Sequence, residues 1–480
     1  MTAVRTARGT ARTADRWASW LVAACCAVGY VTFAVTQWRL LESPSWDLGI
    51  FTQLARAYAG FEAPVVTIKG EGFNLLGDHF HPLLVLLAPV YWIHPSGASL
   101  LIAQAVLFAV SAVPVTTVAR ELLGPVRGTL VGVAYALSWG LQGAVAAQFH
   151  EVAFAVPLLA ASLAAYLRRR WWTCVLWAAP LVFVKEDLGL TVAALGLVLW
   201  WRAGQRRIGR LTVAWGVGWT VLAIGVVLPL LHPDGTWDYY GRLAAGEEAA
   251  DGPGDSAGGV LATVAAAFVP AEKYVTLLLL VGAAGIIGVR SPLIWLWVPT
   301  LAWRFLGNVE YYWGWTWHYS AVLMPVAVAA LLDAVSGRTG TGHLGRRLVP
   351  ARRWASAGTA AAVLTTAIMT VTGPMNRLVE PATYAGSPRA DVVDEMIDIV
   401  AGRTVEADIY LMAYLVPRSQ VYWVGNEGNP PPDRLVLDAT RRTWTDDVAD
   451  AADLAEERHP GQDYELVLDE AGYQVAARVR

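Results

Sequence analysis

The sequence has few charged residues for its length. Charged residues make up 16% of the 480 residues, against about 25% in a typical soluble protein. Hydrophobic residues make up 56%, and the mean hydropathy is +0.43. A water-soluble core cannot absorb this apolar excess, so the composition excludes a wholly soluble protein. The net charge is only −3, and no strong basic field indicates nucleic acid as a partner.

Cysteine is also scarce, and the chain lacks a cleavable signal peptide pattern. Cys25, Cys26 and Cys174 all lie inside apolar runs, which excludes a disulfide framework and a cysteine-based zinc site. Four arginines within residues 1–16 precede an apolar run at 17–40. That run is too long for the apolar part of a signal peptide and has no small-x-small cleavage site. We therefore expect a basic cytoplasmic tail at 1–16 and an uncleaved first membrane span.

Long apolar runs recur along the chain. A membrane span needs about 20 mostly apolar residues. One run, 171–201, is interrupted by Lys185, Glu186 and Asp187 and is too long for one helix but short for two. If it forms two short spans, the sequence predicts eleven spans, near 17–40, 97–119, 126–146, 150–167, 171–185, 187–201, 211–232, 260–289, 291–305, 317–336 and 354–373.

The distribution of arginine and lysine favours two spans in the interrupted run. With two spans, the cytoplasmic segments hold 19 cationic residues and the outward segments before residue 375 hold 7. A single span would place the arginine clusters at 202–210 and 338–353 outside and reverse the usual excess of positive charge in the cytoplasm. The prediction is a mostly α-helical, polytopic bundle over 17–374 in the plasma membrane, with a cytoplasmic N-terminus and an external first loop at 41–96.

From residue 375 onward the composition becomes that of a soluble domain. We expect strands at 409–415, 420–424, 434–437 and 464–468, and an acidic helix at 446–457. The end of the chain indicates two strands around the turn Glu470-Ala471-Gly472. These elements predict an extracytoplasmic α/β or α+β domain over 375–480. The domain contains no recognisable catalytic motif.

Polar clusters that are able to do chemistry fall on the outward side of this topology. Ionisable groups at the membrane edge are costly to place there, so each is a functional candidate. The clusters lie at 45–53, 78–82, 148–151, 185–187 and 311–319. The candidate catalytic or ligand-binding side chains are Asp47, His79, His81, His150, Glu151, Lys185, Glu186, Asp187, Arg304 and His318, and the candidate sugar-stacking side chains are Tyr312, Trp313, Trp315 and Tyr319.

Each cluster also has a structural alternative. Ser43 or Ser45 could cap an interfacial helix with the apolar stripe Trp46, Ile50, Leu54 and Tyr58, and Asp47 would then only complement the helix N-terminus. The His79 and His81 pair could bind a divalent metal or make ordinary polar contacts in the loop. The charges at 150–151 and 186–187 could form a structural ion pair with Lys185. The aromatic run at 311–319 could be a membrane-interface belt.

Several motifs together resemble a known family. The sequences WDLGIFTQ at 46–53 and GDHFHPLLVLLAPVYWI at 77–93 precede a span that contains Gln104. With His150-Glu151, KEDLGL at 185–190, RSQVYWVG at 418–425 and DRLVLD at 433–438, this pattern resembles a family of uncharacterised predicted bacterial membrane proteins. That family is distantly similar to the GT-C glycosyltransferases.

The resemblance implies sugar transfer at the outer face. GT-C enzymes have a cytoplasmic N-terminus, an external first loop with an acidic catalytic residue and often an external C-terminal domain, and they transfer a sugar from a polyprenyl-phosphate donor to an acceptor. Asp47 matches the acidic position, although many GT-C enzymes show a pair of acidic residues there. In this interpretation Asp47 is the base. The histidines with Lys185 or Arg304 neutralise the lipid phosphate, and Glu151, Glu186 and Asp187 orient these groups or hold a divalent cation.

Two other functions compete with the enzyme hypothesis. A transporter or flippase of a lipid-linked substrate would also span the membrane many times, but it usually carries its charges near the bilayer midplane. A non-catalytic scaffold would use the C-terminal domain to bind a partner. The enzyme hypothesis implies the lipid bilayer, a polyprenyl-phosphate-linked sugar and a cell-envelope acceptor as partners.

Overall fold

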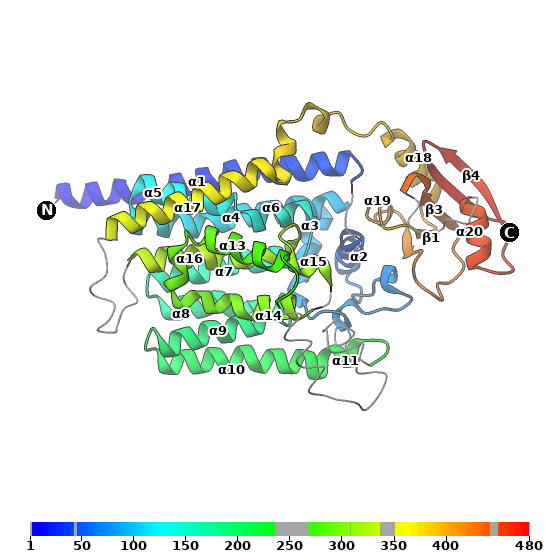
Figure 1. Ribbon diagram of the computed structural model, residues 1–480. Coiled ribbons are helices and arrows are strands. Elements are labelled where there is room, and N and C mark those ends of the chain that lie inside the picture. The colour runs from blue at the N-terminus through cyan, green and yellow to red at the C-terminus, as the bar shows by residue number, and fades with distance from the viewer. Residues whose placement is uncertain are drawn as a thin grey trace.

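The computed structural model describes residues 2–42, 46–235, 268–307, 309–336, 351–441 and 450–479. Most of the helices run side by side in an elongated bundle, and a smaller domain with a sheet caps one end of it (Figure 1). The N-terminus lies at the opposite end of the bundle, far from the C-terminus. This arrangement matches the predicted order of a helical membrane domain followed by a soluble domain.

The bundle contains α-helices interrupted by short 3-10 or π segments. The breaks coincide with proline in several places, as at Pro180 and Pro292, because proline removes a backbone donor. The bundle elements are α1 (Thr2–Arg39), α4 (Gly97–Leu123), α5 (Pro125–Ala136), α6 (Trp139–Ala146), α7 (Val152–Leu167), α8 (Trp171–Ala178), η4 (Ala179–Phe183), α9 (Leu188–Trp201), α10 (Arg206–Leu222), η5 (Ala223–Val227), α11 (Leu228–Leu231), α13 (Glu272–Ala283), η8 (Ile287–Arg290), η9 (Pro292–Trp297), α14 (Val298–Leu306), α15 (Glu310–Trp313), η10 (His318–Ser320), α16 (Leu323–Ser336) and α17 (Ala351–Thr372).

Helical segments lie at all eleven positions predicted to span the membrane, but their lengths differ. Among the described residues, five helices are long and apolar enough to cross a bilayer alone, and a sixth span forms if two helices bent by 70° are joined. The expected spans at 150–167, 171–185 and 187–201 are shorter helices. The expected span at 260–289 lies partly outside the described residues, so eleven crossings remain a prediction. The five long segments are Trp17–Arg39, Gly97–Leu123, Pro125–Ala146, Arg206–Leu231 and Arg353–Thr372.

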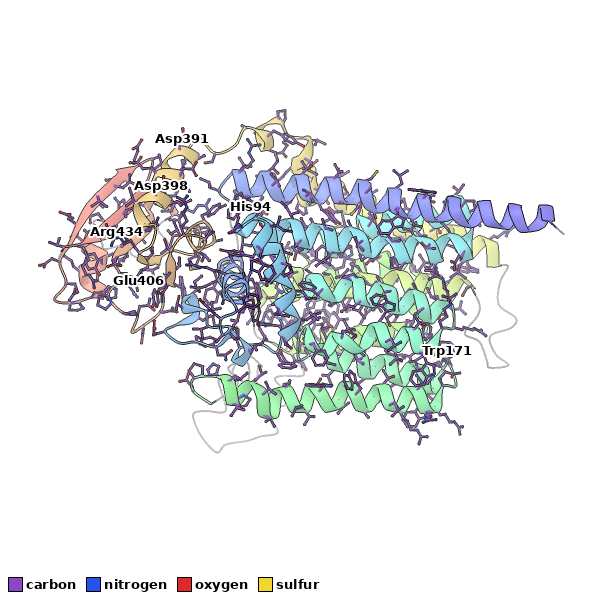
Figure 2. All side chains as sticks on the ribbon, turned by 180° about the vertical axis from the view of Figure 1, so that it is seen from behind. His94, Trp171, Asp391, Asp398, Glu406 and Arg434 are labelled. Atoms are coloured by element: carbon purple, nitrogen blue, oxygen red, sulfur yellow. The ribbon has the colours of Figure 1, made fainter. Side chains whose placement is uncertain are left out.

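The two ends of the bundle carry different residues. Figure 2 places Trp171 at the end away from the C-terminal domain and His94 near that domain. Arg168, three residues before Trp171 in the sequence, pairs there with Glu121 at the end of α4. The arginine-rich turn at 168–170 therefore lies at the end opposite the C-terminal domain. Which end faces the cytoplasm remains a prediction.

The first loop fills the space between the bundle and the C-terminal domain. Its main helix, α2 (Asp47–Ala59), lies across the end of the bundle (Figure 1). Arg56 donates to the carbonyl oxygens of Val416 and Ser419, and Gln53 donates to that of Val421. These bonds tie the loop to the C-terminal domain. The remaining loop elements are η1 (Thr67–Lys69), η2 (Leu75–Gly77), η3 (Pro82–Leu87) and α3 (Ala88–Ile93).

The C-terminal domain is built on a five-stranded mixed sheet with the strand order β2-β1-β3-β5-β4. Strand β1 pairs in parallel with β2 and β3, whereas β5 is antiparallel to β3 and β4. Helix α18 precedes β1, α19 connects β1 to β2, and α20 lies between β3 and β4, whereas residues 424–433 connect β2 to β3 without a helix. The domain is therefore α/β. Its elements are η11 (Pro374–Val379), η12 (Pro381–Tyr384), α18 (Ala390–Val400), β1 (Thr404–Ala407), α19 (Met412–Leu415), β2 (Gln420–Trp423), β3 (Arg434–Asp438), η13 (Ala439–Arg441), α20 (Ala451–Arg458), β4 (Tyr464–Glu470) and β5 (Tyr473–Arg478).

Three predicted strands and the final hairpin match the sheet, but one predicted strand is wrong. Residues 409–415 form a turn followed by the short helix α19, which packs on α2. A short apolar run has no periodicity that separates a strand from a buried helix. The first strand, β1, lies earlier, and the sequence did not predict it. Part of the expected acidic helix, 446–449, lies outside the described residues, and the rest overlaps α20.

Candidate active site

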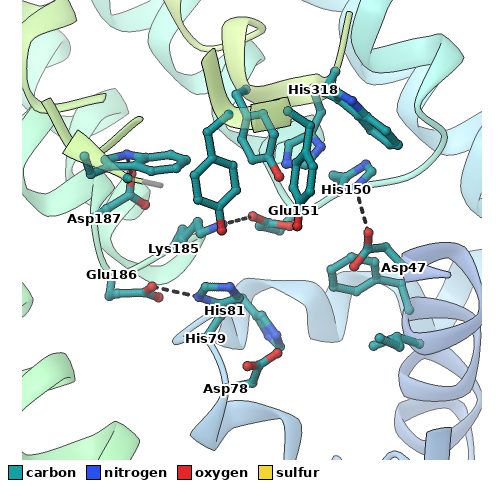
Figure 3. Close-up of a pocket in the computed structure, with 18 of the residues that line it drawn as sticks. Asp47, Asp78, His79, His81, His150, Glu151, Lys185, Glu186, Asp187 and His318 are labelled. Atoms are coloured by element: carbon teal, nitrogen blue, oxygen red, sulfur yellow. Dashed lines mark hydrogen bonds and ion pairs between the residues drawn. The ribbon is translucent and has the colours of Figure 1, made fainter. Parts of the chain in front are cut away.

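A cavity of about 550 Å³ opens at the end of the bundle beside the C-terminal domain. Figure 3 shows its polar side chains converging from the first loop, the 148–151 turn, the 184–187 turn and the segment before α16. These segments are far apart in the sequence and were all predicted to face outward. Of the candidate side chains, those that line the cavity are Asp47, His79, His81, His150, Glu151, Lys185, Glu186, Asp187, Tyr312, His318 and Tyr319.

Asp47 reaches the cavity from the first turn of α2. Its carboxylate oxygen Oδ2 lies 3.3 Å from His150 Nε2, and 36% of its side chain is exposed. No side chain caps the helix at Trp46; Ser43 and Ser45 lie outside the described residues. Ile50 and Leu54 are buried in the protein core. These two residues of the predicted stripe therefore pack against protein, and the position of α2 along the membrane surface stays a prediction.

A strained turn presents His150 and Glu151. Gln148 adopts a left-handed backbone conformation with φ 71°, which is uncommon for a residue other than glycine. Gln104 of α4 holds the turn from both sides: its amide nitrogen donates to the Gln148 carbonyl oxygen, and its amide oxygen accepts from the His150 backbone nitrogen. The buried Gln104 thereby fixes where the two site residues enter the cavity.

The 184–187 turn contributes three consecutive charged side chains. Lys185 Nζ lies 2.8 Å from a Glu151 carboxylate oxygen, and Glu186 lies 2.8 Å from His79 Nδ1. Glu186 also accepts from the Phe80 backbone nitrogen, and Asp187 accepts from the Trp303 indole nitrogen at 3.0 Å. The predicted ion pair with Lys185 is thus made by Glu151.

Burial and the ion pairs shift the pKa values of these groups in different directions. Burial raises the pKa of Asp187 to about 6, with Glu186 adding to the effect and Lys185 opposing it. Burial also works to raise the pKa of Glu186, but His79 outweighs it and holds that pKa at about 2. Burial lowers the pKa of His81 to about 4. The cavity therefore keeps charged and neutral acid and base groups together near neutral pH.

The 311–319 segment forms the opposite wall and depends on Arg304. This side chain is fully buried in α14, and its guanidinium donates to the carbonyl oxygens of Tyr312 and Gly314 and to the Ser320 hydroxyl. Arg304 does not line the cavity, and it holds the backbone of the wall instead of offering a charge to a ligand. The Arg304 guanidinium thus donates to two carbonyl oxygens and one hydroxyl oxygen, and it does not face the cavity where we expected it to bind the lipid phosphate.

Two of the four aromatic candidates lie away from the cavity. Trp313 donates its indole hydrogen to the Gly307 carbonyl oxygen and lies against Lys273. Trp315 lines a separate, smaller pocket of about 250 Å³. Tyr312 and Tyr319 do line the main cavity, and Tyr311 and Trp317 of the same segment join them. The sequence therefore identified the 311–319 segment, but it did not indicate which of its aromatic side chains face the cavity.

Other residues that line the cavity were not predicted from the sequence. Lys69 lies 3.4 Å from Asp78, and its ammonium group sits over the Trp46 ring. Asp78 and Trp46 lie in clusters noted in the sequence, whereas Lys69 stands alone and carried no signal. One side of the cavity is apolar and is formed by Leu190 of α9, Ile224 of η5, and Pro299, Ala302 and Leu306 of α14.

The cavity residues do not form an evident metal centre. Within the described ranges, no group of three or more His, Cys, Asp or Glu side chains is arranged to hold a metal ion. His79 is engaged by Glu186, and His81 is buried with its Nδ1 lacking a hydrogen-bond partner among the described residues. His79 and His81 are therefore not assigned a metal, and the role predicted for them as a metal pair stays a prediction.

The comparisons with known proteins agree with this architecture. The family described as "Predicted membrane protein (DUF2079)" matches residues 37–475. The chain belongs to this family. The match covers the bundle, the cavity segments and nearly all of the C-terminal domain, and it confirms the resemblance inferred from the motifs. No curated protein matches the chain.

A solved structure shares the fold. The chain is similar to ArnT from Cupriavidus metallidurans, whose crystal structure was determined bound to undecaprenyl phosphate. The TM-score is 0.51 at 12% sequence identity, and the match covers 93% of this chain and 97% of ArnT. At this identity the likeness shows the fold alone. It confirms the predicted GT-C-like membrane fold with a C-terminal domain that contains a sheet.

Proposed function

We propose that this protein is a membrane glycosyltransferase of the GT-C type. It transfers a sugar from a polyprenyl-phosphate donor to a cell-envelope acceptor at the outer face of the plasma membrane. The observation that carries the proposal is a cavity that combines buried charges with an apolar wall at one end of a GT-C-like helix bundle. A wholly water-soluble substrate would leave the apolar wall without a partner, and an uncharged lipid would leave the charged side chains without one.

The apolar wall is suited to the lipid part of the donor. Leu190, Ile224 and Leu306 come from three neighbouring bundle segments, and the exposed fraction of Leu190 is 42%. Ile224 lies in η5, a π-helical turn that interrupts the helix leading to α11, and such turns are frequent at functional sites. The first isoprene units of a donor lie here, so that its phosphate enters the charged part of the cavity.

Lys185 and His79 are suited to the phosphate, and Asp47 to the acceptor. Both side chains already face carboxylates, which favour their cationic forms and orient them in a buried place. In an inverting transfer, an acceptor oxygen attacks the anomeric carbon, and the bond from that carbon to the phosphate oxygen breaks. Polyprenyl phosphate leaves with its negative charge, which the cations stabilise. The acceptor proton passes to the Asp47 carboxylate.

The comparison supports the donor class without establishing it for this chain. ArnT was crystallised with undecaprenyl phosphate, a lipid monophosphate. Two lysines and five carboxylates line the cavity here, so it suits one phosphate group better than a more highly charged donor.

Substitution of Asp47 tests the function directly. We expect Asp47→Asn to reduce the transfer of labelled sugar from a polyprenyl-phosphate donor about 10²- to 10⁴-fold, because Asn cannot accept the proton. Membrane levels of the protein should stay normal. The assay measures sugar transfer by purified protein in nanodiscs, beside the amount of protein that reaches the membrane.

Asp391→Asn is the matched control. Asp391 also stands in the first turn of a helix, α18, but it is exposed in the C-terminal domain. If Asp47 only complements a helix N-terminus, both substitutions should cost about 0.3–1 kcal/mol of stability and leave transfer intact. Wild-type transfer by Asp47→Asn would remove the catalytic assignment and favour a scaffold.

A further inference from the structure

The imidazole of His150 has a defined partner at each ring nitrogen. Nδ1 lies 3.1 Å from the carbonyl oxygen of Gln148. A carbonyl oxygen only accepts, so we infer from this partner that Nδ1 carries a hydrogen. Nε2 then carries a lone pair in the neutral ring, and it faces the Asp47 carboxylate at 3.3 Å. Figure 3 shows this contact as a dashed line between the two side chains.

This geometry leaves room for one proton between the two side chains. A lone pair and a carboxylate repel each other at this distance, whereas a proton on Nε2 turns the contact into a charge-assisted hydrogen bond. We propose that Asp47 and His150 act as one proton-accepting couple in the transfer reaction, an inference that rests on the function proposed above. His150 does not touch the acceptor in this scheme; it acts through Asp47 as a positioning residue and proton store.

The proton balance of the step is simple. The acceptor O–H bond breaks as the acceptor oxygen bonds to the anomeric carbon, and the proton moves to Asp47 Oδ2. It then passes to His150 Nε2, which leaves an imidazolium beside a carboxylate. Release of this proton to water returns the couple to its starting state. No other reactant is needed.

Sharing the proton also bears on how strong a base Asp47 can be. An isolated Asp titrates near 3.9 and an isolated imidazole near 6.5. A catalytic base works best when its proton affinity lies near the operating pH. When two groups share a proton, the proton affinity belongs to the pair and not to either side chain alone. A partly exposed aspartate thereby acts as a stronger base than it would alone.

The surroundings of His150 favour a single positive charge. His150 stacks on His318 with ring centroids 3.5 Å apart and an interplanar angle of 20°, so protonation of both rings would be repulsive. Phe51 contacts the edge of the stack and adds no charge. The titratable and charged groups that face this position are Asp47 on α2, His79 and His81 on the first loop, Glu151 beside it, Lys185 on the 184–187 turn, Arg304 on α14, and His318 and Tyr319 on η10.

The first arm of the test is the pH profile of sugar transfer. Gln at position 150 can still donate to Asp47 but cannot take up a proton. We expect His150→Gln to lower kcat about 10²-fold at neutral pH with an unchanged KM for the donor. The acid limb of the kcat/KM profile should move down by at least about one pH unit, toward the range of a lone carboxylate. An acid limb in the same place as in the wild type would overturn the proposal.

The second arm is independent of sugar transfer. Protein labelled with ¹⁵N-histidine, in nanodiscs, is titrated by NMR, and the His150 signal is assigned by its loss in His150→Gln. We expect Asp47→Asn to shift the titration midpoint of His150 Nε2, because an uncharged amide replaces the carboxylate that faces this nitrogen at 3.3 Å. The exposed His94, outside the cavity, is the internal control and should not respond.

The two arms separate two failures. An unchanged His150 midpoint in Asp47→Asn overturns the couple even if the enzyme transfers sugar. A coupled titration in a wild-type protein that transfers no sugar from any polyprenyl-phosphate donor overturns the transfer reaction, and with it the catalytic use of the couple. A shifted midpoint together with a shifted acid limb supports the proposal.

Discussion

The two ends of the helix bundle hold ion pairs of the same length in opposite environments. Arg168 and Glu121 lie 2.8 Å apart at the end near Trp171, with side-chain exposures of 23% and 45%. Lys185 and Glu151 are also 2.8 Å apart, at the cavity end, with exposures of 15% and 4%. Water solvates the first pair, so it costs little to hold. The second pair is held at a cost of desolvation, which indicates a functional reason for its place.

The largest expected difference between the ends is their accessibility from outside the cell. In a background with Cys25, Cys26 and Cys174 replaced by Ala, we expect a membrane-impermeant maleimide to label Glu427→Cys in intact cells. Gln205→Cys, in the arginine-rich turn before α10, should be labelled only after permeabilisation, because the cationic end stays in the cytoplasm. Labelling of Gln205→Cys but not Glu427→Cys in intact cells would invert the topology and exclude an outward-facing cavity.

A second comparison removes the cation from each ion pair. Lys185→Met leaves Glu151 buried and unpaired, and we expect a loss of about 3–5 kcal/mol in the free energy of unfolding. Arg168→Met at the solvated end should cost about 0–1 kcal/mol. Denaturant unfolding in micelles measures both. The double variant Lys185→Met with Glu151→Gln should recover part of the loss, since Glu151 then no longer leaves an unpaired buried charge. Equal costs at the two ends would contradict the contrast.

A smaller effect should appear in the pH dependence of stability. Burial and Lys185 act to lower the pKa of His79, but Glu186 and Asp78 outweigh them and raise it overall. The stabilising contribution of His79 is therefore present below about pH 6.5 and is lost as the pH rises through the raised value. The pKa of Glu186, at about 2, is lowered, so its contribution is present above about pH 4.5 and is lost as the pH falls toward 2. The pair therefore stabilises most between about pH 4.5 and 6.5.

The stability difference between wild type and His79→Gln measures this window. We expect about 1.5–3 kcal/mol near pH 5.5, the range for a hydrogen bond to a charged group, and less at pH 8 and at pH 3. The matched difference between wild type and Arg168→Met should stay nearly flat from pH 5 to pH 8, because an arginine does not titrate there. A flat difference for His79→Gln as well would show that the pair does not titrate as described.

The apolar pattern of the sequence predicted most of the fold. Runs of apolar residues placed a helix at each expected span, and β2, β3 and the β4–β5 hairpin followed from alternation and turn residues. Strand β1 was missed because Glu406 within it is fully buried, and it is compensated by Arg458 and His459 of a distant segment. A sequence pattern assigns such a glutamate to the surface. Tertiary pairing of this kind is invisible to local rules.

The candidate site was only partly predictable, for a similar reason. Topology alone indicated that the segments of Asp47, His150 and Lys185 share one end of the bundle. It did not indicate which acid pairs with Lys185, and it could not show that Arg304 turns toward backbone carbonyl groups instead of the cavity. The apolar wall was also missed, because Leu190 and Ile224 in a membrane helix look the same whether they face lipid or a cavity. The roles of the lining residues remain predictions.

The most direct test is a cryo-EM map of the protein in nanodiscs that contain undecaprenyl phosphate. The account predicts density for the phosphate beside Lys185, with the lipid chain leaving along Leu190, Ile224 and Leu306. Density for the lipid elsewhere on the bundle, with the cavity free of phosphate at saturating lipid, would contradict it.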